Sequence, residues 1–185
     1  LESVVQRFMD IAFFDEFPAR REVIRATVDD PDDDLLTGWD SQLHVVSARG
    51  SDGPFEWETE LPRTPDWREL LIAESDGRPI GFIQIIDPAR EESRYWGDVP
   101  ANLRAIDIWI GEGDALGKGY GTEMMRQAIA RCFAHASVTK ILIDPLESNA
   151  DARRFYERYG FTPVGRYDFM VGSHADEDII MRLKL

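Results

Sequence analysis

Apolar and polar residues alternate in several short stretches of the chain, a pattern that predicts β-strands. The clearest stretch, residues 104–111, is rich in isoleucine and contains a single acidic residue, Asp107. Residues 69–75 and 79–87 are also predicted strands, and Asp76–Gly77–Arg78 between them predicts a tight hairpin turn. Further strands are predicted at residues 22–28, 138–144, 162–171 and 177–183, the last two as an antiparallel pair.

Apolar residues at spacings of three and four predict helices elsewhere. Residues 149–159 form one such helix, which begins with the capping sequence Ser148–Asn149–Ala150–Asp151 and ends at Gly160. A short helix is predicted from the acidic run 29–34 through Trp39, whereas residues 42–48 fit a strand or a helix. The longest helix follows residue 119, and its apolar face consists of Tyr120, Met124, Met125, Ala128, Ile129, Cys132 and Phe133.

A glycine-rich loop joins strand 104–111 to this longest helix, with Gly117, Gly119 and Gly121 at alternate positions. Glycines let a backbone approach a ligand closely, and the first amides of a helix have no partner inside it, so this order predicts a cradle for phosphate. A P-loop is excluded because serine or threonine does not follow Gly–Lys, and a dinucleotide fingerprint is excluded because Thr122 stands where glycine is required. A simple surface turn before an ordinary helix is the alternative interpretation of this loop.

Composition narrows the possible functions. The 185 residues suffice for one domain with a sizeable core, and the net charge of −14 argues against nucleic acid while it suits solubility or a polycationic substrate. No apolar run reaches the length of about 18 residues that a membrane span needs. The single cysteine, Cys132, is expected in the core of a cytoplasmic protein. His44, His135 and His174 lack the neighbours of a metal site, so no metal is expected.

Several motifs together resemble the GNAT acetyltransferases, namely Leu116–Gly–Lys–Gly–Tyr–Gly–Thr122, Asn149 and Tyr156–Glu–Arg–Tyr–Gly–Phe161. Further segments are similar to the aminoglycoside 6′-N-acetyltransferase branch, namely Ala105–Ile–Asp–Ile108, Val138–Thr–Lys–Ile141 and Asp144–Pro145. The resemblance covers about residues 70–165. It implies one α/β domain of GNAT type, residues 22–185 after an N-terminal extension of residues 1–21. The domain would have a mixed twisted sheet with helices on both faces and splayed central parallel strands.

The resemblance also implies acetyl-CoA-dependent N-acetylation of a primary amine, most directly the 6′-amine of an aminoglycoside-like polycation. A peptide N-terminus, a polyamine or a small metabolite is the next class of acceptor, and an acyl-CoA sensor without turnover is a third interpretation. Asp107 is expected to be the base, because a carboxylate within an apolar strand is costly unless it is paired or used, and desolvation would raise its pKa. Tyr156 is expected to protonate the leaving thiolate. A solvent-side aspartate and a plain core tyrosine are the structural alternatives.

Acetyl-CoA is implied to lie along the central strand, with its thioester oxygen near the amides of Trp109 and Ile110 and its pyrophosphate on residues 117–122. Leu116 stands where many family members have glutamine or arginine. The 6′ branch also tolerates leucine at this position. The implied cofactor-binding residues are Trp109, Ile110, Gly117, Lys118, Gly119, Tyr120, Gly121, Thr122 and Asn149. The implied acceptor-binding residues are Trp57, Tyr95, Trp96, Asp98 and Asp144, the last also a second candidate base. Both a monomer and a homodimer are compatible with the sequence.

Overall fold

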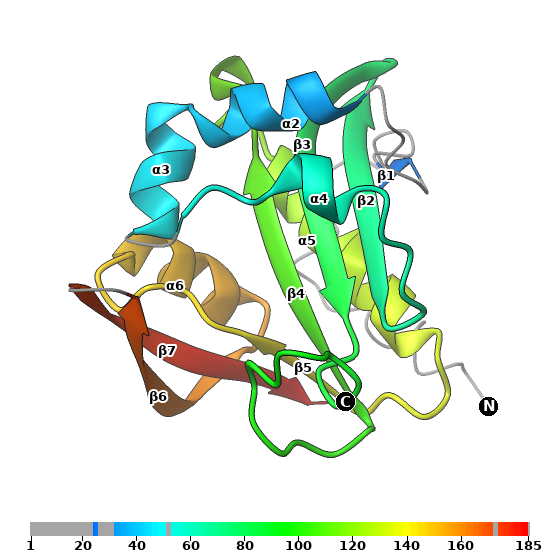
Figure 1. Ribbon diagram of the computed structural model, residues 1–185, viewed down its shortest axis with the longest axis vertical. Coiled ribbons are helices and arrows are strands. Elements are labelled where there is room, and N and C mark those ends of the chain that lie inside the picture. The colour runs from blue at the N-terminus through cyan, green and yellow to red at the C-terminus, as the bar shows by residue number, and fades with distance from the viewer. Residues whose placement is uncertain (1–23, 26–31, 51–52, 172–173, 185) are drawn as a thin grey trace.

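A seven-stranded sheet organises the part of the chain that the structure describes. The computed structural model describes residues 24–25, 32–50, 53–171 and 174–184. The strands lie in the order β1-β2-β3-β4-β5-β7-β6 (Figure 1). Neighbouring strands run antiparallel except β4 and β5, which run parallel. The sheet is therefore mixed, as the resemblance implied, and β4 is its central strand.

Hairpins build both ends of this sheet. β2 (Arg68–Ser75) and β3 (Arg78–Ile86) form the predicted hairpin, and both Asp76 and Gly77 at its turn have positive φ, the conformation of a tight turn that matches strand twist. The short strand β1 (Ile24–Arg25) pairs with β2 and is the described part of predicted strand 22–28. At the other end, β6 (Thr162–Val171) pairs with β7 (His174–Lys184). The sequence placed His174 in a loop, but it begins β7 because pairing extends to Val171.

The parallel strands separate where the functional residues of the sequence analysis lie. β4 (Leu103–Ile110) pairs with β5 (Lys140–Ile143) only from Leu103↔Lys140 to Ala105↔Leu142. Beyond Ala105, β4 continues beside β3 alone. This separation confirms the splayed central strands that the resemblance implied. It also makes β5 shorter than predicted, so that Asp144 follows the strand.

Helices cover both faces of the sheet (Figure 1). α5 (Tyr120–Phe133) packs on one face, where its predicted apolar residues Met124 and Ile129 are at most 2% exposed. α6 (Ala150–Arg158) packs against the same core. On the other face lie α2 (Asp33–Asp40), α3 (Leu43–Arg49) and α4 (Trp57–Glu60). The ambiguous segment 42–48 is thus a helix, whose apolar Val45 is buried, whereas His44 and Arg49 are half-buried and its remaining positions are exposed.

Cys132 is a core residue, as predicted. Its side chain is 1% exposed on the apolar face of α5, and burial raises the pKa of the thiol to about 12. A thiol with this pKa is protonated and unreactive at neutral pH. The expectations for residues 1–21 lie outside the described residues.

Candidate active site

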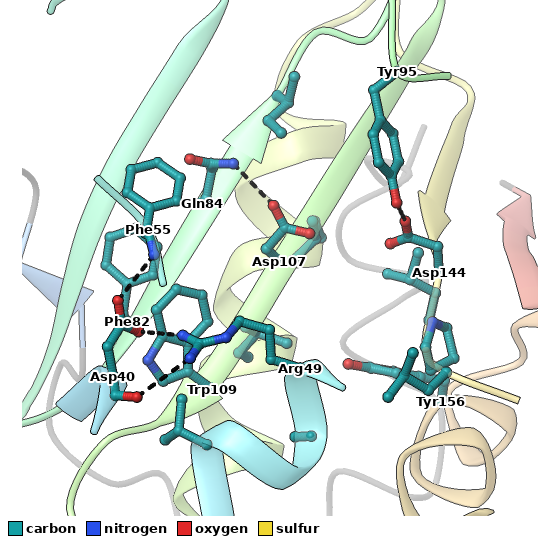
Figure 2. Close-up of a pocket in the computed structure, with 18 of the residues that line it drawn as sticks. Asp40, Arg49, Phe55, Phe82, Gln84, Tyr95, Asp107, Trp109, Asp144 and Tyr156 are labelled. Atoms are coloured by element: carbon teal, nitrogen blue, oxygen red, sulfur yellow. Dashed lines mark hydrogen bonds and ion pairs between the residues drawn. The ribbon is translucent and has the colours of Figure 1, made fainter. Parts of the chain in front are cut away.

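A pocket of about 390 Å³ opens where β4 and β5 separate (Figure 2). This volume is typical of sites for small molecules. Its walls come from the ends of α2 and α3, from β3 and β4, from the loop between those strands, and from α6. The residues named from sequence that line it are Tyr95, Trp96, Asp107, Trp109, Asp144 and Tyr156.

Asp107 faces this pocket from the central strand. Because side chains alternate along a strand, Ile106 and Ile108 face the core beneath α5 whereas Asp107 faces the opposite side. Its register partner on β3 is Gln84, which is only 7% exposed and donates a hydrogen bond from Nε2 to Asp107 Oδ2 at 2.9 Å. A buried amide therefore orients the carboxylate. The alternative of an aspartate on the solvent side of an edge strand is disfavoured, because Asp107 lines the pocket and accepts a hydrogen bond from the buried Gln84.

A second carboxylate, Asp144, lines the pocket just beyond β5. The hydroxyl of Tyr95 donates a short hydrogen bond to Asp144 Oδ2. The ring of Tyr95 packs edge-on against Trp96, with ring centroids 5.2 Å apart. Both aromatic residues belong to the loop between β3 and β4. The loop thus brings two aromatic rings to the side of the pocket where Asp144 lies.

Tyr156 completes the group of reactive side chains. Figure 2 shows Asp107 with Gln84 on one side and with Asp144 and Tyr156 on the other. Burial raises the pKa of Tyr156 above its usual value, and the charges of Asp107 and Asp144 raise it further. Both carboxylates therefore lie close enough to act on the hydroxyl electrostatically. A phenol with a raised pKa stays protonated at neutral pH and can donate a proton.

Backbone groups at the end of β4 face the gap left by β5. The amide of Gly111 donates to Ile80 O at 3.0 Å and therefore points toward β3. Because successive N–H groups of a strand point to opposite sides, the N–H of Ile110, which pairs with Gly81, points away from β3. The alternation of a strand directs the N–H of Trp109 toward β3 instead. Of the two amides expected near a thioester, the one on the open edge therefore belongs to Ile110. Trp109 contributes its ring to the pocket wall.

Helices α2 and α3 hold this end of β4 in place. His44 Nε2 lies 2.9 Å from Ile110 O, so the ring nitrogen donates to that carbonyl. Trp39 Nε1 donates to Glu112 Oε1 at 2.8 Å. The Trp39 ring lies so close to Gly111 that a Cβ there would be 2.0 Å from Trp39 Cδ2. Helices α2 and α3 are thus in direct contact with the segment that leads from β4 into the glycine loop.

The glycine loop has the backbone of an anion cradle. Gly117 and Gly119 have φ of 69° and 83°, in the left-handed region that favours glycine. Gly119 is the N-cap of α5, and no side chain of the described residues caps that helix. The amides of residues 120–122 have no acceptor inside the helix and are therefore available to an anion such as a pyrophosphate. Lys118 is exposed in this loop and adds positive charge.

The remaining residues that were expected to bind the cofactor lie at the first turns of α5 and α6. Gly121 lies against Ile110, since a Cβ there would be 3.7 Å from Ile110 Cδ1. Thr122 O accepts a hydrogen bond from the Tyr159 hydroxyl at 2.7 Å, and Tyr120 packs on the core. Asn149 caps α6, because its Oδ1 accepts from Ala152 N at 3.1 Å. The Asn149 oxygen thus serves the fold, and Nδ2 is the donor that it can offer to a ligand.

Two of the residues expected to bind the acceptor are not among those that line the pocket. Trp57 is 2% exposed and donates from Nε1 to Asp40 Oδ2 at 2.7 Å, so it supports the pocket wall from behind. Asp98 has a side chain 95% exposed and pairs with Arg94 at 3.2 Å. Sequence periodicity shows neither the burial of Trp57 nor the exposure of Asp98, because both depend on how the loops fold back on the sheet.

The sequence analysis missed several lining residues, among them the polar residues Gln84, Asp40 and Arg49. Gln84 had a detectable signal, since it is a polar residue within the apolar run 82–86, much as Asp107 is within β4. Asp40 and Arg49 end α2 and α3, in the part of the chain that carried no motif. Their proximity, with Arg49 Nη1 at 3.2 Å from Asp40 Oδ1, arises only from the packing of these helices.

Searches for two other kinds of site were negative for the described residues. No group of three or more His, Cys, Asp or Glu residues there could hold a metal ion. No described helix has the length and apolar character required to cross a bilayer.

Comparison with known proteins gives consistent matches. Residues 29–169 match the family described as acetyltransferase (GNAT) domain. The chain is 35% identical to aminoglycoside N(6′)-acetyltransferase type 1 of Klebsiella pneumoniae, over 74% of this chain and 76% of that protein. It is 37% identical to a kanamycin resistance protein of Rhizobium radiobacter, over 44% of this chain and 82% of that protein.

Solved structures agree with these relatives. The aminoglycoside acetyltransferase AAC(6′)-Ib in complex with coenzyme A superposes with a TM-score of 0.72 at 27% identity, over 88% of this chain and 94% of that chain. The same enzyme with coenzyme A and kanamycin gives a TM-score of 0.73 at 26% identity, over the same shares. Because the family match spans the central strand, the glycine loop and the helices that build the site, this chain belongs to the GNAT acetyltransferases.

Proposed function

We propose that this protein transfers the acetyl group of acetyl-CoA to the 6′-amine of an aminoglycoside. The observation that carries the proposal is the convergence of Asp107, Asp144 and Tyr156 on one pocket where the central strands separate. Carboxylates in a pocket suit a cationic amine. The relatives support the same acceptor, because a solved structure of AAC(6′)-Ib, 27% identical to this chain, contains ribostamycin and coenzyme A.

The first chemical requirement is a free amine. An ammonium with a pKa of about 8 to 10 is mostly protonated at neutral pH, and its deprotonation costs roughly 1.4 to 4 kcal/mol. Asp107 is the proposed base that takes this proton, directly or through a water molecule. Gln84 holds the carboxylate in one orientation through its hydrogen bond of 2.9 Å. A fixed carboxylate keeps the amine aligned for attack.

Asp144 is the proposed second anchor for the acceptor. Its contact with the Tyr95 hydroxyl holds one carboxylate oxygen against the loop between β3 and β4. A carboxylate in this position attracts the positive charge of a polycation and orients the amine toward Asp107. Trp96 offers an apolar surface beside it. Asp144 therefore serves binding, while the hydrogen bond from Gln84 favours Asp107 as the base.

The donor site fits acetyl-CoA. Acetyl-CoA supplies an activated thioester that a free amine can attack. The uncapped first turn of α5, beginning at Gly119, is suited to the pyrophosphate. The N–H of Ile110 on the open edge of β4 is suited to stabilise negative charge on the carbonyl oxygen. Tyr156 is the proposed proton donor to the departing sulfur, because it lines the pocket and its hydroxyl stays protonated at neutral pH.

The test is release of thiol from acetyl-CoA with a matched pair of acceptors. Neomycin B carries a 6′-amine, and paromomycin carries a hydroxyl at that one position. We expect rapid thiol release with neomycin B and none with paromomycin. Equal release with both compounds would mean that another amine is acetylated. Release with lysine or putrescine but with neither antibiotic would reject the aminoglycoside acceptor and leave the family chemistry intact.

A further inference from the structure

The segment proposed to hold the phosphates of acetyl-CoA carries more acids than bases. Residues 111–123 lead from β4 into the first turn of α5 and contain Glu112, Asp114 and Glu123 against the single base Lys118. Taken alone, this segment has a net charge of −2, in a chain whose net charge is −14. Such a segment repels a phosphate unless cations from other parts of the chain compensate its charge.

Arg78 compensates two of these acids from a different element. It begins β3, and its guanidinium donates to Asp114 Oδ2 and Oδ1 at 2.9 and 3.0 Å. Nη2 also donates to Glu112 Oε2 at 2.6 Å. The pairing with Asp114 is bidentate, which is the strongest geometry for a guanidinium and a carboxylate. One arginine therefore engages both carboxylates of the turn that leads into the glycine loop.

The third acid of the segment has an arginine of its own. Arg126 Nε donates to Glu123 Oε2 at 3.0 Å, and Arg126 Nη2 contacts the other carboxylate oxygen. Each acid of residues 111–123 is thus paired with an arginine. The exposed Lys118, by contrast, forms no ion pair with the part of the chain that the structure describes. Together the two arginines bring the charge of the segment to zero and leave the lysine available to a ligand.

Lys118 and Asp114 are close enough to influence each other. The guanidinium of Arg78 holds the pKa of Asp114 below its usual value, and the charge of Lys118 lowers it further. Without Arg78, the carboxylate of Asp114 would lose its partner beside an exposed lysine, and the two opposite charges would attract each other. Such a pairing would withdraw Lys118 from an anion on the loop.

We propose that Arg78 is a positioning residue for the donor, because it engages Glu112 and Asp114 and so keeps Lys118 available to the phosphates of acetyl-CoA. This inference rests on the proposed function, since it assumes that these phosphates lie on residues 117–122. Arg78 acts through the charge of its neighbours and does not contact the reacting atoms. The donor site is thus completed by the hairpin of β2 and β3, which lies outside the glycine loop.

The test measures the dissociation constant of coenzyme A by calorimetry at low salt for Arg78→Gln, for Asp114→Asn and for the double variant. Arg78→Gln should raise this constant about threefold to fivefold, the scale of an exposed ion pair. Asp114→Asn should leave it unchanged or lower it, because the acid that competes for Lys118 is removed. The double variant should bind nearly as the wild type does, since the two changes cancel in charge.

A purely structural role of Arg78 predicts a different pattern. If its contacts only hold the turn in place, Asp114→Asn will weaken binding as well and will not rescue Arg78→Gln, which would overturn the inference. An unchanged constant in Arg78→Gln would also overturn it. At high salt the effect of Arg78→Gln should vanish because charges are screened, and an effect that persists there would contradict the proposal.

The matched control is Arg131→Gln, which changes the net charge of the protein by the same amount. Arg131 is an exposed arginine in the last turn of α5, and it pairs with Glu69 on β2. We expect its replacement to leave the dissociation constant unchanged, and equal weakening by both variants would show that only the overall charge matters. Failure of the wild-type protein to bind coenzyme A would instead reject the proposed function.

Discussion

At the scale of single residues, the site consists of reactive groups that buried or aromatic neighbours hold in position. Gln84 orients Asp107, and Tyr95 contacts Asp144. Trp57 and Phe55 fix Asp40, which in turn holds Arg49. A static pocket of this kind reduces the entropy lost when a substrate is aligned.

The role of Asp107 predicts a selective loss of turnover. Asp107→Asn keeps the size of the side chain and an oxygen that can accept from Gln84 Nε2, but it cannot take a proton. We expect kcat for a 6′-amino aminoglycoside to fall about a hundredfold or more, with the KM for acetyl-CoA nearly unchanged. The control is Asp66→Asn, which removes an exposed partner of Arg90 that is not among the lining residues. Unchanged kcat in Asp107→Asn would transfer the role of base to Asp144.

The role of Tyr156 predicts a loss of rate with intact packing. Tyr156→Phe keeps the ring contacts with Phe155 and Phe161, at centroid distances of 5.4 and 5.9 Å, and removes only the hydroxyl. If the hydroxyl protonates the thiolate, kcat should fall about tenfold to a hundredfold. If Tyr156 is only a core residue, steady-state kinetics at pH 7.5 will match the wild type.

The raised pKa of Tyr156 adds a test by pH. Burial and two nearby carboxylates keep the folded-state pKa above the ordinary value of about 10. The folded state then holds the proton more tightly than the unfolded state, so this contribution to stability is complete below about pH 10 and is lost as the pH rises further. Denaturant unfolding at pH 9 to 11 should therefore show a weaker loss of stability in Tyr156→Phe than in the wild type. Equal slopes would show that the tyrosine is not buried in this way.

At the scale of elements, the strand β4, the glycine loop and α5 form one continuous unit, which we propose holds the donor. Gly119→Val places a β-branched side chain at a residue with φ of 83° and crowds the cradle. We expect the dissociation constant for coenzyme A to rise at least about tenfold, as measured by calorimetry, because the backbone can no longer approach the pyrophosphate. Gly77→Val is a matched control, since Gly77 has φ of 77° in the β2–β3 turn and no atom within 4 Å of its Cβ position. Equal binding by both variants would place the cradle elsewhere.

The contact between α2 and the end of β4 predicts that the part of the pocket wall formed by α2 depends on Gly111. Gly111→Ala would put a Cβ 2.0 Å from Trp39 Cδ2, so α2 must move. We expect a loss of stability of about 1 to 3 kcal/mol, as in other overpacked cores, and a higher KM for the acceptor. Gly38→Ala in α2, where nothing lies within 4 Å, should be stabilising by up to about 1 kcal/mol. A wild-type melting temperature for Gly111→Ala would disprove the close contact.

At the scale of the whole molecule, the net charge of −14 favours a polycationic acceptor and disfavours an anionic donor. Salt screens charges over about 8 Å at physiological ionic strength. Raising the salt concentration should therefore increase the KM for kanamycin A and leave constant or decrease the KM for acetyl-CoA. Steady-state kinetics from low to high salt will measure both trends. A rise of both constants would point to a general effect of salt on the fold.

The sequence alone predicted most of the elements that build the donor site. The strand carrying Asp107, the glycine loop and the capped helix with Tyr156 were all identified, because alternation, glycine spacing and capping are local properties of the backbone. The predicted ends of strands differed from the observed ones where pairing with a neighbouring strand decides them, as at β5 and at His174. The choice between strand and helix for residues 42–48 also required the fold, since a single buried residue, Val45, leaves both patterns possible.

The acceptor end of the site followed from tertiary structure. Gln84 meets Asp107 only through the register of β3 with β4, and Arg49 meets Asp40 only through the packing of α3 beside α2. Trp57 and Asp98 were placed at the acceptor by sequence, yet folding puts one behind the wall and the other in solvent. Local sequence therefore specifies where an element can cradle phosphate or carry a carboxylate, because those properties depend on neighbours a few residues away. Contacts between distant segments specify which side chains share the pocket, because burial and pairing depend on how the whole chain packs.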